Sequence, residues 1–124
     1  MIIMIRASLV ALSQANTTNN YSVLHDLGSP NFQSGNSVQR LQQIFAPFRT
    51  SSIDLAPVVY VTPQMSAAPT ITNGRLRMVG FFPTQPMRVT YDLLFEPSGG
   101  LWKLFGISVN LVPASANAVA APAR

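Results

Sequence analysis

The chain has 124 residues, of which 48% are hydrophobic and only 10% are charged, so we expect one domain with ample core material and a sparsely charged surface that favours self-association. The net charge of +4 results from eight Lys and Arg residues against four Asp and Glu residues. The basic residues are spread along the chain, which argues against a nucleic-acid interface because such an interface needs a basic stripe. The absence of cysteine excludes disulfides and thiolate chemistry, and no apolar run approaches the roughly 20 residues of a membrane span.

The first part of the sequence predicts two consecutive helices. Residues 2–14 place apolar side chains at spacings of three and four, as on one buried helix face: Ile2, Ile5, Leu9 and Leu12. The polar run 16–20 is expected to end this helix, because Asn and Thr side chains compete for backbone hydrogen bonds. A short helix over 21–27 should then end at a left-handed Gly28, with Pro30 enforcing the stop.

A third helix is predicted over residues 37–48. Asn36 or Ser37 can cap its start, and Pro47 should end or bend it. Its apolar stripe consists of Val38, Leu41, Ile44, Phe45 and Phe48.

From Leu55 onward the composition changes to β-branched and aromatic residues. A short edge strand is predicted over 58–61, because prolines bracket it. Two longer strands, 75–82 and 87–95, alternate strictly and so have one core face each. We expect these core residues to be Leu76, Met78, Gly80 and Phe82 in the first strand and Met87, Val89, Tyr91, Leu93 and Phe95 in the second.

The last strand, 101–112, is apolar in both alternating sets, which is typical of a central strand covered on both faces. Short Pro- and Gly-rich connections should join the three long strands as antiparallel hairpins in chain order. Helices first and strands afterwards indicate the α+β class. We expect a single domain over residues 1–113 and a disordered tail over 114–124.

Two segments resemble the nuclear-transport-factor-2-like superfamily of cystatin-like proteins, in particular small bacterial members that are often exported. Residues 9–32 (LVALSQANTTNNYSVLHDLGSPNF) resemble its paired entry helices, and residues 99–109 (GGLWKLFGISV) resemble its closing strand. The resemblance implies a curved sheet wrapped on helices as a cone with a possible cavity, and dimerisation through the outer sheet face. Export is not evident, because Arg6 interrupts the apolar start, so bacterial cytoplasm and periplasm both stay open.

Enzymes of this superfamily, similar to ketosteroid isomerase, use a cavity carboxylate or a His–Asp pair to move protons. His25 and Asp26 are neighbours on one short helix, so their side chains should point about 100° apart and not pair. If Phe82 pairs with Met87, Arg77 falls opposite Asp92, and the two should form a cross-strand ion pair. We therefore expect no catalytic residue, with Asp92 and His25 as the alternatives.

Metal and cofactor sites are not expected, because one histidine and scattered acids cannot supply a tetrahedral ligand set. Aromatic residues are the candidates for an apolar ligand pocket, in which Tyr91 and Trp102 would offer polar groups. The alternative is that these side chains, Trp102 included, simply fill the core. The candidate pocket residues are Phe45, Phe82, Tyr91, Phe95 and Trp102.

The leading functional hypothesis is a non-catalytic dimeric domain that binds a small apolar ligand in the cone cavity. The alternatives are an isomerase- or cyclase-like enzyme and a protein-docking module with a filled core. Helices on one side of the sheet leave Val79, Phe81 and Leu94 on the other, so we expect a homodimer through this outer face. Its polar rim would consist of Arg75, Arg77, Arg88 and Asp92.

Overall fold

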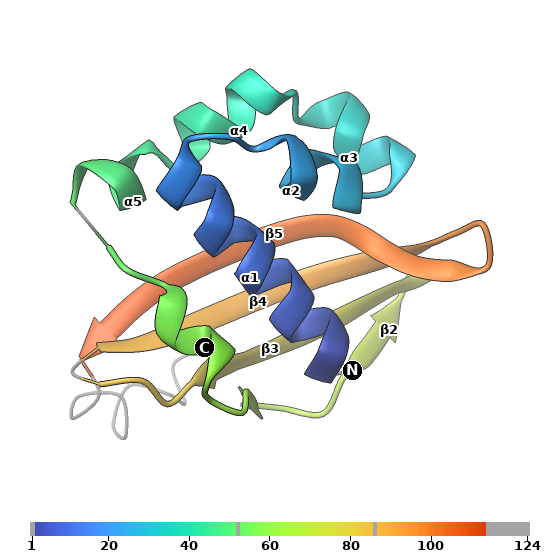
Figure 1. Ribbon diagram of the computed structural model, residues 1–124. Helices are drawn as coiled ribbons and strands as arrows, with labels where there is room; N and C mark the ends of the chain where they lie inside the picture. The colour runs from blue at the N-terminus through green and yellow to red at the C-terminus, as the bar shows by residue number, and fades with distance from the viewer. Residues whose placement is uncertain (1, 52, 86, 114–124) are drawn as a thin grey trace.

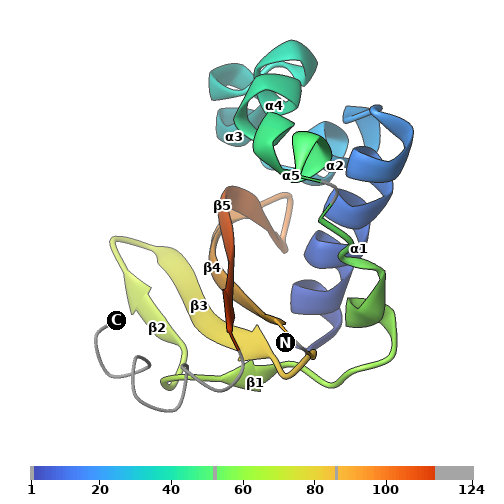
Figure 2. The same cartoon turned by 90° about the vertical axis from the view of Figure 1, so that its left-hand side faces the viewer.

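A computed structural model describes residues 2–51, 53–85 and 87–113. These residues form an α+β fold in which helices α1–α5 pack on one face of a curved, five-stranded antiparallel sheet (Figure 1, Figure 2). The tail 114–124, predicted to be disordered, and the side chain of Ile2 lie outside the described residues. Within the described part, no helix is long and apolar enough to cross a membrane.

Helix α1, Ile2–Thr18, lies across the sheet and buries the predicted apolar face (Figure 1). It continues past the predicted end, because the hydroxyls of Thr17 and Thr18 donate to carbonyls of the preceding turn and leave the helix intact. The helix ends at Asn19, whose φ of 54° is left-handed, a conformation that Asn tolerates better than most residues.

Gly28 was expected to be left-handed after α2, Ser22–Leu27, but its φ of −79° and ψ of 165° are extended. The reason is tertiary: Gly28 forms a parallel bridge with Leu104, and the Ser29 N–H donates to the Leu104 carbonyl over 2.8 Å. Pro30 begins a further helix, α3, Pro30–Gly35, because the first helical position needs no N–H partner.

The predicted third helix is two helices, α4, Val38–Ile44, and α5, Ala46–Thr50. Ser37 caps α4, and the break at Phe45 agrees with the bend expected from Pro47. Ile44, expected in the buried stripe, is 44% exposed. The predicted strand 58–61 is wrong: Ala56–Val59 is a 3₁₀ helix, η1, since the fixed φ of its Pro suits a helical turn.

The strand order is β1-β3-β4-β5, with β2 also paired to β3. Strand β3, Arg75–Phe82, has the predicted bounds and core face, and β4, Met87–Ser98, buries its predicted face except Met87, which is 37% exposed. Phe82 pairs with Val89 rather than Met87, because Thr84 shapes the connection by donating from its hydroxyl to the Met87 carbonyl. Two short strands, β1, Gln64–Met65, and β2, Thr70–Thr72, were not predicted.

Strand β5, Leu101–Pro113, is an edge strand and not the predicted central one. Phe95 pairs with Leu104 while Leu94 pairs with Gly106, so Phe105 is the extra residue of a β-bulge. A bulge shifts the alternation of a strand by one residue. It brings Leu104 into the core with Val109, although the plain alternation placed these two residues on opposite faces.

Candidate functional site

Four of the five candidate pocket residues are buried in the core, where they are 0–3% exposed: Phe45, Phe82, Tyr91 and Phe95. Phe45 stacks on Tyr21 at 6.1 Å between ring centroids, and Phe82 meets Tyr91 edge-on at 5.7 Å. The Tyr91 hydroxyl donates to the Gln64 carbonyl over 2.8 Å, and burial raises the pKa of Tyr91 to about 12. These rings therefore pack against protein atoms.

Trp102, expected in the core, is instead 39% exposed. It pairs with Pro97 next to the turn that joins β4 and β5, and Figure 1 shows this turn extending beyond the helices. Phe45 also lines a shallow hollow of about 180 Å³ between α4 and β5, together with Phe32, Leu41, Ile44, Phe105, Ile107 and neighbouring atoms.

Asp92 lies on the outer face of β4 and forms the predicted ion pair with Arg77. The Arg77 Nη2 and Nε atoms donate to the two carboxylate oxygens over 2.6 and 3.0 Å, and this hydrogen bonding raises the pKa of Arg77. Arg77 lies diagonally across, because Val79 is the residue opposite Asp92. Its ion pair and its half-buried place on the outer face take Asp92 out of the enclosed apolar setting that a carboxylate base of the isomerase kind needs.

His25 and Asp26 do pair, contrary to expectation: Nδ1 of His25 and Oδ1 of Asp26 lie 2.9 Å apart. The angle of 100° separates only the directions in which the two side chains leave the helix, and rotation of the His ring and the short carboxylate closes the remaining gap. The Asp26 side chain is 75% exposed, whereas that of His25 is 21% exposed. The half-buried His25 therefore pairs with a carboxylate that is open to solvent.

The outer face of the sheet is the face opposite the helices (Figure 2). Its apolar centre consists of Val79, Phe81 and Leu94, which are all half-buried. The guanidinium of Arg88 lies 4.2 Å above the Phe81 ring, and that of Arg75 lies 4.0 Å above Phe105. Cation–π contacts of this kind keep the aromatic rings in place on an open face.

A buried carboxylate, Glu96, was missed by the sequence reasoning. It is 8% exposed and accepts hydrogen bonds from the Ser29 hydroxyl over 2.5 Å and from Asn31 over 3.4 Å, with Arg75 Nε 3.5 Å away. The Ser29 hydroxyl above all, with Asn31 and Arg75, lowers the pKa of Glu96. Nothing in the local sequence signals this cluster, because Ser29 and Glu96 are 67 residues apart.

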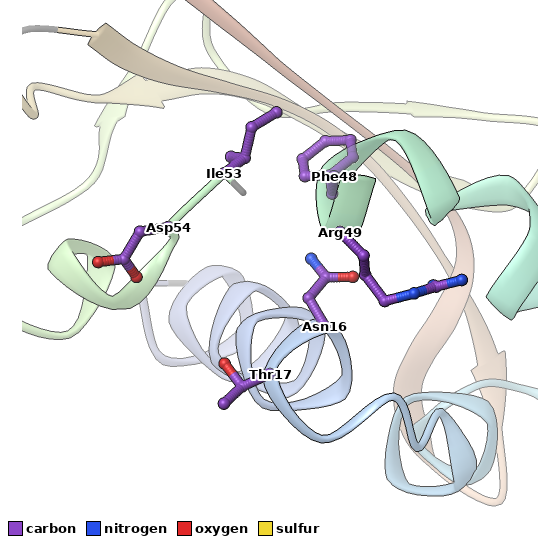
Figure 3. Close-up of a pocket in the computed structure, with 6 residues that line it drawn as sticks. All are labelled: Asn16, Thr17, Phe48, Arg49, Ile53 and Asp54. Atoms are coloured by element: carbon purple, nitrogen blue, oxygen red, sulfur yellow. The ribbon is translucent and has the colours of Figure 1, made fainter. Parts of the chain in front are cut away.

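A second hollow, of about 260 Å³, lies between the end of α1, the end of α5 and the segment before η1 (Figure 3). Its lining combines polar and apolar side chains: Asn16, Thr17, Phe48, Arg49, Ile53 and Asp54. Sequence reasoning assigned Asn16 and Thr17 to a helix boundary and Phe48 to the predicted apolar stripe, and it did not bring these residues together with Arg49, Ile53 and Asp54. The hollow depends on the break between α4 and α5, which turns α5 toward α1.

A chain of hydrogen bonds lies beside this hollow. Arg49 Nη1 donates to the Tyr21 hydroxyl over 2.8 Å and to the Gln42 carbonyl over 2.9 Å, and the Tyr21 hydroxyl donates to Asn16 Oδ1. The Asn16 Nδ2 atom is buried and has no hydrogen-bond partner among the described residues. An unpaired buried donor is uncommon in folded proteins.

In the part of the chain that the structure describes, no three His, Asp or Glu side chains come together as metal ligands. Comparison of the chain with known protein families, with curated proteins and with solved structures finds no match.

Proposed function

We propose that this chain is a non-catalytic docking module that forms a homodimer through the outer face of its sheet. The observation that carries the proposal is the apolar centre of that face, Val79, Phe81 and Leu94, which no helix covers (Figure 2). The packing of the candidate pocket aromatics into the core supports docking over a ligand cavity. The ion pair of Asp92 with Arg77 on the outer face, and the pairing of His25 with the exposed Asp26, weigh against the isomerase-like alternative.

A second copy suits this face because a two-fold axis would bring each apolar centre onto its own copy. Arg77 and Asp92 beside the centre would then form part of the polar rim that surrounds the apolar core of an interface. The resemblance to the nuclear-transport-factor-2-like superfamily points to the same face. Arginines outnumber acids on the outer face, so the affinity of the dimer should rise as salt screens the repulsion between its cations. Salt would instead lower the affinity of an acidic partner.

Sedimentation at micromolar concentration tests the proposal, with Phe81→Glu as the disrupting variant and Val23→Glu as its control. Val23 is 65% exposed on α2, away from the outer face. We expect dimers for the unaltered chain and for Val23→Glu, and a folded monomer for Phe81→Glu, because a desolvated carboxylate without a partner is costly. A monomeric unaltered chain would refute the homodimer.

Binding of a small apolar ligand is the second candidate function, and one observation favours it. The hollow between α4 and β5 is lined mainly by apolar side chains, including Phe45, one of the residues proposed from the sequence to contact a ligand. Its volume of about 180 Å³ limits the ligand to a small ring or a short chain. A native mass spectrum of the purified protein tests this function, because a bound ligand adds a discrete mass to the folded chain.

A further inference from the structure

We infer that the hollow between α1 and α5 binds a small uncharged molecule with an apolar body and a carboxamide group. The carrying observation is the unpaired buried amide nitrogen of Asn16 beside a hollow whose apolar wall is made by Phe48 and Ile53 (Figure 3). The inference concerns a surface remote from the outer sheet face and does not rest on the homodimer.

The hydrogen-bond chain determines which atom of the Asn16 amide has no hydrogen-bond partner. Arg49 can only donate, so the Tyr21 hydroxyl oxygen accepts from it and directs its single proton to Asn16. The Asn16 atom that meets Tyr21 is therefore the oxygen, and the NH₂ group is turned away from this chain. Figure 3 shows that nitrogen directed toward Phe48 and Ile53.

A ligand that supplies an acceptor to this nitrogen restores the hydrogen bonds that the amide lost when it was buried. Phe48 and Ile53 are only half-buried, and Ile53 follows α5 in the segment that leads to η1. Insertion of an apolar ring between these two side chains would separate them and bring a carbonyl oxygen to the Asn16 nitrogen.

The charges around the hollow favour an uncharged ligand. Figure 3 shows both charged side chains directed away from Phe48 and Ile53: the Asp54 carboxylate accepts from the Ala56 N–H, and the Arg49 guanidinium is occupied by Tyr21 and Gln42. An anionic ligand would meet the negative charge of Asp54 without a compensating cation. A carboxamide instead accepts from Asn16 and carries no charge for Asp54 to repel. The volume of about 260 Å³ suffices for one aromatic ring with a short polar group.

Benzamide is the test ligand, and its binding is monitored through the ¹H–¹⁵N signals of the Asn16 side-chain amide. We expect saturable shifts of these signals with benzamide, and binding at least about tenfold weaker for benzoate, which has the same ring and a negative charge. Acetamide, which lacks the ring, should also bind at least about tenfold more weakly.

Two isosteric variants assign the roles. Asn16→Asp keeps the acceptor for Tyr21 and removes the donor, so benzamide binding should be lost. Asp54→Asn keeps a side-chain oxygen for the Ala56 N–H, to which Asp54 is bonded over 2.9 Å, and should bring benzoate binding close to that of benzamide. The inference is overturned if benzamide leaves the Asn16 amide signals unmoved, as a resident water alone would, or if folded Asn16→Asp binds benzamide as well as the unaltered chain does.

Discussion

Gly80→Ala should destabilise the fold strongly, although the change adds one methyl group. Gly80 lies in β3 between two neighbouring strands and pairs with Met65 of β1 and Tyr91 of β4. A Cβ atom here would overlap the carbonyl oxygen of Gln64 and would stand 2.5 Å from the Tyr91 hydroxyl oxygen. Since the carbonyl belongs to the backbone, β1 must move away, and this movement breaks the hydrogen bond from Tyr91 to Gln64.

The expected cost combines two effects. Forcing an extra carbon into a packed core typically costs about 1–3 kcal/mol, and leaving the buried hydroxyl of Tyr91 without an acceptor costs about 1–3 kcal/mol more. The lower conformational entropy of an unfolded chain with Ala in place of Gly returns about 0.4–1 kcal/mol. Gly80→Ala should therefore lower the free energy of unfolding by about 1–5.5 kcal/mol.

Urea unfolding followed by circular dichroism measures this change, and Gly106→Ala is the matched control. A Cβ atom at Gly106 in β5 would stand 3.6 Å from Leu94 side-chain atoms, an ordinary contact, so the control should stay within about 1 kcal/mol of the unaltered chain. Tyr91→Phe in both backgrounds separates the hydrogen bond from the overlap. Equal unfolding midpoints for the two alanine variants would contradict the close approach of β1 to Gly80.

Ser29→Ala and Ser37→Ala each remove a helix N-cap, which should lower the free energy of unfolding by about 1 kcal/mol. Only Ser29→Ala should also raise the pKa of Glu96 toward its ordinary value. Since the pKa of Glu96 is lowered in the folded chain, its stabilising effect holds above the ordinary carboxyl pKa and is lost as the pH falls through the folded value. Carboxyl ¹³C titration measures this pKa, and identical Glu96 curves for the two variants would refute the assignment. Trp102→Ala should lower the free energy of unfolding by less than about 1.5 kcal/mol, because an exposed residue leaves little cavity. Acrylamide should quench the fluorescence of Trp102 readily. Fluorescence that acrylamide does not quench would place this residue in the core.

Features that depend on local periodicity were predictable from the sequence. The direction of a side chain in a strand depends only on whether its position is odd or even, so the buried face of β3 followed from its alternation. The Arg77–Asp92 ion pair was also predicted, although the register was wrong by two residues. A shift of two keeps every side chain on its face, and a long Arg side chain reaches a diagonal neighbour.

The tertiary structure alone decided the features that depend on residues distant in sequence. Strand β5 is apolar in both alternating sets because the bulge at Phe105 reverses its alternation midway, a pattern that a straight central strand shares. Gly28 is extended because Leu104 lies beside it. Glu96 is buried because Ser29 and Asn31 meet it across the fold. The Asn16 amide nitrogen is unpaired because α5 turns back onto α1 and brings Arg49 to Tyr21. Each of these outcomes depends on which segments meet in space, and short-range spacing along the chain carries no record of that.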